Sequence, residues 1–228
     1  GRLYEAMGKM IELTAADGHK LAAYRAEPAG KPRGGIVVIQ EIFGVNSHVK
    51  AVADGYAADG YLAIAPAMFD RVQRGFDVGY TPEDIAKGRE LRPKISVDWA
   101  MKDAEAAVKA AASAGKVGIV GYCWGGFVVW MASARIPGLA CAVPYYGGGI
   151  LDNADIEPKV PVMGHFGEKD SMIPVDGVKK LAEKHKKHQI FIYAADHGFN
   201  CDQRGSYDAA AAKQARERTL AFFRQHVG

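Results

Sequence analysis

The chain has 228 residues, of which 49% are hydrophobic, and its 29 basic and 26 acidic residues leave a formal net charge of only +3. This length and composition suit one core, so residues 1–228 are interpreted as a single domain. The balanced charge excludes the concentrated basic surface of a nucleic-acid-binding protein, and no stretch approaches the ~20 apolar residues that cross a membrane, so neither partner is expected.

The chain begins with residues 1–6, which we expect to be a disordered or extension segment because Met7 can serve as the natural start. These residues lack the apolar core of a secretory signal. The three cysteines, Cys123, Cys141 and Cys201, form no CxxC pair and have no spacing typical of zinc ligands or of a disulfide framework. We therefore expect a cytoplasmic protein with no metal and no other cofactor.

Eight apolar runs are predicted to be strands. They are Met10–Ala15, Leu21–Ala26, Gly35–Gln40, Tyr61–Ala65, Val117–Tyr122, Ala140–Tyr145, Val160–His165 and Ile190–Ala194. The first two are separated by a short turn at Ala16–His19 and predict a hairpin. The later runs are continuously apolar, as expected for parallel strands with both faces covered. The pattern predicts a mostly parallel eight-stranded sheet with an antiparallel edge.

Helices are predicted between these strands. Thr81 precedes Pro82 and two acids, which is typical of a helix N-terminus. The alanine-rich segment Asp98–Ala112 has amphipathic spacing, whereas Trp124–Ala134 is apolar nearly all round and should be buried against the sheet. A last helix, at about residues 207–226, should close one face. The sequence thus predicts an α/β fold with helices on both faces of the sheet.

A cysteine lies at a predicted strand-to-helix turn, in the run Gly121-Tyr122-Cys123-Trp124-Gly125-Gly126. This GxCxG motif is the thiol version of the GxSxG nucleophile elbow, where glycines let strand and helix approach closely. The position lifts the sulfur clear of the sheet and places it at the positive end of a helix, which favours thiolate. Taken alone, the motif also fits a small, buried cysteine.

A thiol nucleophile needs a base and a group that orients this base. His197 follows the last predicted strand, and Asp170 follows the strand before it. Nucleophile, acid and histidine then occur in the chain order typical of α/β-hydrolases. His165 is the competing histidine, although a residue packed against backbone explains it equally. Asp170 alone would also fit a turn or a helix cap. Cys123, Asp170 and His197 are therefore predicted to form a catalytic triad.

An acyl-transfer site also needs donors for a developing oxyanion. The amide after the nucleophile belongs to Trp124, and the amide from the loop after the third predicted strand belongs to Ile42. In the same loop, Glu41 is expected at the mouth of the site, close to the thiol. The alternative for Glu41 is an ordinary surface position.

Four segments together resemble the dienelactone hydrolase family, also called carboxymethylenebutenolidase. They are residues 40–44 (QEIFG), 121–126 (GYCWGG), 167–170 (GEKD) and 196–199 (DHGF). The resemblance implies an α/β-hydrolase fold without a large cap domain. It also implies that the Cys-Asp-His triad opens lactones or cleaves esters through a thioester. In the family, the glutamate at the position of Glu41 interacts with the resting nucleophile until substrate releases it, which implies that Cys123 rests as a protected thiol.

The resemblance is less complete at the substrate-binding positions. Family members that act on dienelactone hold its carboxylate with arginines, and Arg71 matches one of them. The other position is occupied by Cys201, with Arg204 three residues further on. Trp124, Tyr145, Phe43 and Phe199 are candidates for an apolar wall of the binding site, although such aromatics are also ordinary core residues.

The sequence therefore predicts a monomeric, cofactor-free hydrolase of small lactones or activated carboxylic esters. A thiol suits substrates with good leaving groups, such as the enol oxygen of an enol lactone. One alternative is an esterase or thioesterase with an unrelated neutral substrate, which the arginine position filled by Cys201 favours. A second is a non-catalytic thiol redox sensor, because an activated thiol oxidises readily.

Overall fold

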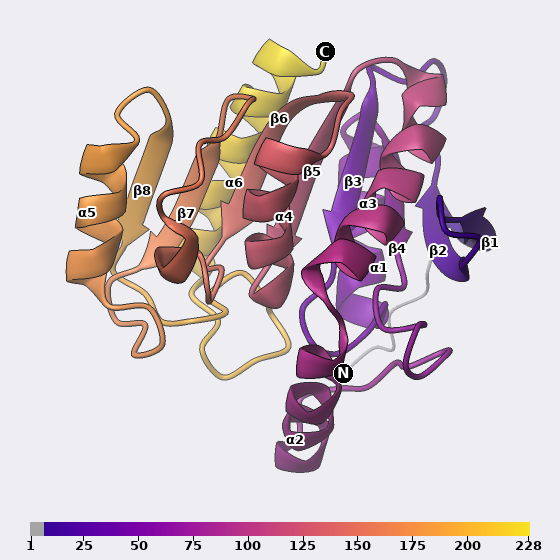
Figure 1. Ribbon diagram of the computed structural model, residues 1–228. Helices are drawn as coiled ribbons and strands as arrows, with labels where there is room; N and C mark the ends of the chain where they lie inside the picture. Colours follow the sequence, from indigo (N-terminus) through magenta and orange to yellow (C-terminus); the bar gives the residue numbers. More distant parts are fainter. Residues whose placement is uncertain (1–6) are drawn as a thin grey trace.

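The computed structural model describes residues 7–228, so the expectation for residues 1–6 lies outside the described residues. One eight-stranded sheet runs through it in the order β1-β2-β4-β3-β5-β6-β7-β8 (Figure 1). The strands are β1 Lys9–Thr14, β2 Lys20–Ala26, β3 Gly35–Ile39, β4 Leu62–Pro66, β5 Val117–Tyr122, β6 Leu139–Tyr145, β7 Met163–Gly167 and β8 Gln189–Tyr193. β2 is antiparallel to β1 and β4, and the other neighbouring pairs are parallel. The predicted mostly parallel sheet with an antiparallel edge is confirmed.

One strand is displaced from its predicted position. β7 begins at Met163, whereas the apolar pattern predicted a start at Val160. Pro161 lies inside the predicted run and has no N–H to donate to a strand ladder. Its carbonyl accepts from the Ala142 amide at 3.0 Å, but regular pairing begins only after it. As a result, His165 lies in the middle of the strand and not at its end.

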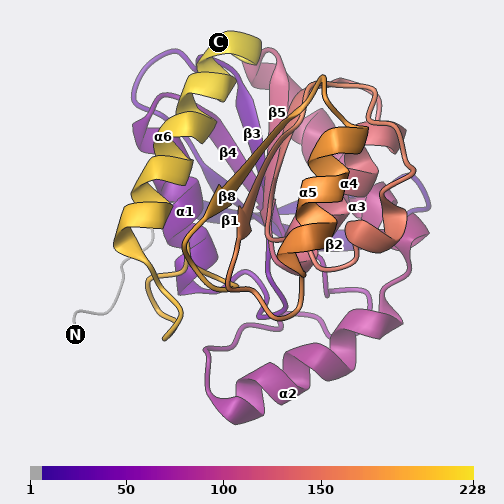
Figure 2. The same cartoon turned by 90° about the vertical axis from the view of Figure 1, so that its left-hand side faces the viewer.

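Helices cover both faces of the sheet. They are α1 Ser47–Ala58, α2 Pro82–Leu91, α3 Val97–Ala111, α4 Trp124–Arg135, α5 Val175–Lys184 and α6 Ala209–His226, with 3₁₀ turns at Arg92–Lys94, Ala112–Ala114 and Leu151–Asn153. Figure 2 shows α1 and α6 on one face and α3, α4 and α5 on the other. The central strands β3 and β5 are consequently buried along their whole length, which explains their continuously apolar sequences.

α2 departs from this layered arrangement. It lies beyond the lower end of the sheet in Figures 1 and 2, between β4 and α3 in the chain. Thr81 starts it with a capping box, because its side chain accepts from the Asp84 amide and Asp84 accepts from the Thr81 amide. The segment between β4 and α3 contributes only this one α-helix outside the layers, so the prediction of a fold without a large cap domain is confirmed. Among residues 7–228, no helix has the length and apolar character needed to span a bilayer.

Candidate active site

The turn between β5 and α4 holds Cys123 in a strained conformation, with φ 60° and ψ −124°. A non-glycine residue in such a region costs on the order of 1–3 kcal/mol, which the surrounding packing must offset. The flanking glycines explain how this packing forms. A Cβ on Gly121 would lie 2.2 Å from the Gly125 carbonyl oxygen, and one on Gly125 would lie 2.3 Å from the Gln40 carbonyl oxygen. Strand and helix therefore approach closely enough to fix the turn.

The structure brings Cys123, His197 and Asp170 into one hydrogen-bonded line. His197 Nε2 lies 3.1 Å from Cys123 Sγ, and its Nδ1 lies 2.6 Å from Asp170 Oδ2. The other carboxylate oxygen of Asp170 accepts from the Met172 amide at 2.9 Å, which fixes its orientation. All three of the aligned residues are buried. They follow β5, β8 and β7, so the carboxyl ends of three parallel strands supply them.

The electrostatics of this line favour a charged imidazole. Burial by itself lowers the pKa of His197, but its contacts with Asp170 and Cys123 outweigh burial and raise the pKa to about 10. A positive imidazole beside a sulfur atom stabilises thiolate. The arrangement can therefore hold a nucleophilic sulfur and a proton donor side by side.

The two predicted oxyanion donors lie on segments that touch each other. Gly125, in the first turn of α4, packs directly on the Ile39 and Gln40 carbonyls at the end of β3. The first helical amide, that of Trp124, has no acceptor within its own helix. The contact brings the loop that carries Ile42 beside Trp124, and both residues are buried.

Glu41 is buried and does not face solvent. Its carboxylate accepts from Arg204 Nη1 at 3.1 Å and from the Tyr80 hydroxyl at 3.1 Å. No hydrogen bond of the described residues joins it to Cys123, whose sulfur is paired with His197 instead. The sequence did not identify Tyr80 and Arg204 as the partners of Glu41. No motif marks Tyr80, and the position of Arg204 in the site did not follow from the sequence pattern.

A cavity of about 440 Å³ opens next to Cys123 and His197. It is also lined by Arg92, Pro93, Ile95, Trp124, Phe127, Gly148, Gly149, Asn153 and Met172. Arg92 is the one lining residue with a permanent charge. It is half-buried, and within residues 7–228 no hydrogen bond or ion pair involves its side chain. No sequence motif marks Arg92; it reaches the cavity because α2 ends there and Pro93 redirects the chain.

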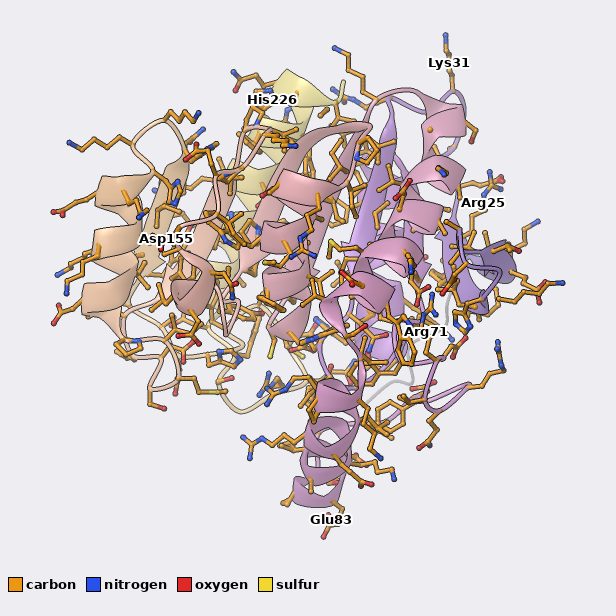
Figure 3. The ribbon with its side chains drawn as sticks, viewed as in Figure 1. Arg25, Lys31, Arg71, Glu83, Asp155 and His226 are labelled. Carbon is orange, nitrogen blue, oxygen red and sulfur yellow. The ribbon has the colours of Figure 1, made fainter. Side chains whose placement is uncertain are left out.

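Arg71 lies elsewhere, among carboxylates. Its guanidinium donates two hydrogen bonds to Asp103, at 3.0 and 2.9 Å, and two to Asp17, at 2.8 and 3.0 Å. It therefore ties α3 to the β1–β2 turn, at the place labelled in Figure 3, and it does not line the cavity beside Cys123. Its side chain is 7% exposed, and the Trp99 ring lies against it.

The predicted aromatic wall divides in a similar way. Trp124 lines the cavity, whereas Phe43, Tyr145 and Phe199 are buried in the core and do not. The Tyr145 hydroxyl lies 3.0 Å from Thr219 Oγ1, which also contacts His165 Nε2 at 2.9 Å.

His165, the competing histidine, is fully buried in that polar network. Its Nδ1 lies 2.8 Å from the Tyr193 hydroxyl. Burial lowers the pKa of its imidazole to about 3. These contacts place it as a packed residue with both ring nitrogens bonded, away from the Cys123 thiol.

The eight-stranded sheet, its two helical layers and the nucleophile turn between β5 and α4 define an α/β-hydrolase. The chain belongs to the dienelactone hydrolase family, whose model matches residues 21–227. It is therefore a carboxylic ester hydrolase.

Relatives cover nearly the whole chain. It is 37% identical to a Synechocystis sp. protein provisionally named carboxymethylenebutenolidase, over 91% of this chain and 93% of the relative. It is 32% identical to the carboxymethylenebutenolidase of Pseudomonas putida, over 93% and 94% of the two chains. A Klebsiella pneumoniae crystal structure, provisionally described as a dienelactone hydrolase, superposes with a TM-score of 0.83 at 32% identity, covering 96% of this chain and 99% of that one.

Proposed function

We propose that this enzyme opens small lactones and cleaves activated carboxylic esters through a thioester on Cys123. The observation that carries the proposal is the buried line from Asp170 through His197 to the thiol, with its 2.6 Å and 3.1 Å contacts. The family relationship supports lactone or ester hydrolysis as the reaction class. A pure redox sensor has no use for an imidazole held by a carboxylate.

In the first half of the proposed reaction, the Cys123 thiolate attacks the acyl carbon. The carbonyl electrons move onto oxygen, where the amides of Ile42 and Trp124 stabilise the charge. When the tetrahedral intermediate collapses, the C–O bond breaks and the leaving oxygen takes the proton of the His197 imidazolium. In a lactone this oxygen stays tethered to the acyl group.

In the second half, water attacks the thioester while His197 accepts its proton. The C–S bond then breaks, and the thiolate is restored beside the imidazolium. The net reaction adds one water across the ester bond and consumes nothing else. Asp170 keeps the imidazole in the tautomer that presents Nε2 to sulfur.

The charge of the cavity favours substrates that carry a carboxylate. Among residues 7–228 the Arg92 side chain makes no hydrogen bond or ion pair, and a guanidinium matches a carboxylate through two parallel hydrogen bonds. Arg71 uses four of its five N–H donors on Asp17 and Asp103, so in this arrangement it has no pair of donors left to grip a substrate carboxylate. We therefore assign the role expected for Arg71 to Arg92. An apolar wall from Ile95, Phe127 and Met172 suits the rest of a small acyl group.

A substrate panel tests the proposal. Dienelactone, neutral five-membered lactones and aryl esters would be assayed with the wild-type enzyme, with Cys123→Ala, and with Cys141→Ala as the control for a buried cysteine outside the site. We expect Cys123→Ala to abolish turnover and Cys141→Ala to keep it. Mass spectrometry after rapid acid quenching should detect the acyl adduct on the peptide containing Cys123. Full turnover by Cys123→Ala would refute the mechanism, and peroxide sensitivity without any ester turnover would favour the redox alternative.

A further inference from the structure

A second cluster of reactive side chains lies beside the proposed proton path. Glu41 from the loop after β3, His48 from the first turn of α1, and Cys201 from the loop after β8 place their ligand atoms within 4.8 Å of one another. They are 1%, 5% and 0% exposed, respectively. No step of the proposed reaction uses His48 or Cys201. The cluster therefore has no explanation in the hydrolysis itself.

The three side chains supply a donor set typical of zinc. A thiolate sulfur, an imidazole nitrogen and a carboxylate oxygen bind Zn²⁺ at about 2.0–2.3 Å, which puts ligand atoms roughly 3.5 Å apart around a tetrahedral ion. Closing the cluster from its present spacing requires side-chain movements on the order of 1 Å. Three protein ligands leave the fourth position of the ion for water.

The surroundings of His48 fit the same interpretation. Asp202 Oδ1 lies 3.7 Å from His48 Nδ1, beyond hydrogen-bond distance but close enough for a small movement to bring the carboxylate onto this nitrogen while Nε2 binds an ion. Carboxylates commonly orient metal-binding histidines in this way. A cavity of about 390 Å³ is lined by His48, Asp202 and residues of α1 and α6, so solvent reaches the His48 side of the cluster. Figure 2 shows α1 and α6 on the face of the sheet opposite α4.

Arg204 is the group that opposes a cation, because it already pairs with Glu41 at 3.1 Å. The local charges nevertheless balance once an ion is bound. The Cys201 thiol loses its proton to solvent as the S–metal bond forms. Glu41, Asp202 and this thiolate then match the two charges of the ion and the one of Arg204.

We propose that Glu41, His48 and Cys201 form a binding site for a thiophilic divalent cation, Zn²⁺ in particular, and that its occupation slows hydrolysis. The connection to activity is structural. Cys201 is held to Gly198 by a turn in the loop that carries His197, and Glu41 immediately precedes the oxyanion residue Ile42. Drawing Glu41 and Cys201 together therefore shifts both loops that shape the active site. The inhibition rests on the proposed function, whereas the binding does not.

Binding is tested with Co²⁺ as a spectroscopic substitute for Zn²⁺. The wild-type protein should develop a thiolate-to-cobalt charge-transfer band and visible bands of tetrahedral intensity at one equivalent, and Zn²⁺ should remove them. Cys201→Ala and His48→Ala should lose the bands, while Cys123→Ala and Cys141→Ala keep them. Cys201→Ser replaces Cys201→Ala if circular dichroism shows the latter unfolded. No thiolate band in the wild type, or a band lost in Cys123→Ala and kept in Cys201→Ala, overturns the proposal.

Inhibition is tested by titrating Zn²⁺ into an aryl-ester assay. The wild type should lose at least tenfold in rate, and Cys201→Ala should need at least tenfold more Zn²⁺ for the same loss. Identical titrations for the two proteins would show that the ion acts at Cys123 and His197, which overturns the regulatory role. If the protein hydrolysed no ester, the proposed function would fail while the cobalt spectra still decided the metal site.

Discussion

Asp170→Asn is a sharp test of the proton path, because it removes one charge and preserves the side-chain shape. Asp170 Oδ2 faces His197 Nδ1 at 2.6 Å, and Oδ1 accepts from the Met172 amide at 2.9 Å. Asparagine keeps an oxygen for Met172 and turns its amide group toward the imidazole. We therefore expect a folded protein that has lost the negative charge beside His197.

The expected effect follows from the electrostatics of His197. Burial lowers the pKa of this imidazole, and the contacts with Asp170 and Cys123 raise it to about 10. With each pKa unit worth about 1.4 kcal/mol, the net rise from 6.5 to about 10 favours imidazolium by roughly 4–5 kcal/mol after the opposing effect of burial. The hydrogen bond to Asp170 is the largest single contact that raises this pKa, and its loss should cost roughly 3 kcal/mol, or on the order of 100-fold in kcat/KM.

The pH dependence has a definite sign. Because the folded pKa of His197 is raised, the stability from its contact with Asp170 is full below the ordinary pKa of about 6.5 and is lost as pH rises through about 10. Asp170→Asn should therefore be less stable than the wild type near pH 7, with the difference vanishing above pH ~10.

The assay is alkylation of Cys123 by iodoacetamide, measured with kcat/KM on an aryl ester. At neutral pH, Asp170→Asn should be alkylated at least about tenfold more slowly than the wild type. Glu168→Gln is the matched control: it removes a negative charge from the same loop, but this residue is exposed and makes no bond to His197. Wild-type alkylation and turnover in Asp170→Asn would refute the reasoning.

Three further predictions concern the cavity, the turn and Arg71. Arg92→Ala should raise KM for a carboxylate-bearing ester about 10- to 100-fold and leave KM for its neutral analogue within about twofold. Arg89→Ala, in the same helical turn but outside the cavity, should change neither KM. Equal effects of Arg92→Ala on both esters would exclude the anchoring role. Gly125→Ala should lower the free energy of unfolding by about 1–3 kcal/mol in urea titrations, because the added Cβ would lie 2.3 Å from the Gln40 carbonyl oxygen. Gly148→Ala is the control and should be nearly neutral, because no described atom lies within 4 Å of its added carbon. Arg71→Ala should lower the free energy of unfolding by about 3–5 kcal/mol in the same titration, because it leaves Asp103 buried without its partner. Unchanged stability together with a raised KM would instead show that Arg71 binds substrate.

The fold and the placement of the three aligned residues followed from local sequence rules. Continuous apolar runs marked the parallel strands, and chemistry-bearing residues just after β5, β7 and β8 converge because the carboxyl ends of parallel strands share an edge. The GxCxG spacing indicated a close approach of strand and helix, which the 2.2 Å and 2.3 Å contacts of added Cβ atoms at Gly121 and Gly125 now explain. Such features are local in sequence, so no knowledge of packing was needed.

The environment of the arginines could not be predicted in the same way. Arg71 follows β4 and matched a family position, but its partners Asp17 and Asp103 come from a hairpin turn and from α3. Only the packed fold shows that two carboxylates occupy the guanidinium. Arg92, in contrast, matched no sequence pattern. It follows α2 in a polar stretch, and the path of the chain after Pro93 turns it to the cavity.

The position of Cys201 shows how one departure from a family pattern can be absorbed by neighbouring residues. Arg204, three residues later, reaches the Glu41 carboxylate at 3.1 Å, so a cation is still supplied beside this glutamate. The thiol itself is buried with Glu41 and His48. The loops after β3 and β8 thus contribute to two clusters at once: Ile42 and His197 belong to the proposed acyl-transfer site, and Glu41 and Cys201 belong to the proposed metal site. Because neighbouring residues in each loop are covalently joined, a ligand that contracts one cluster must displace the other.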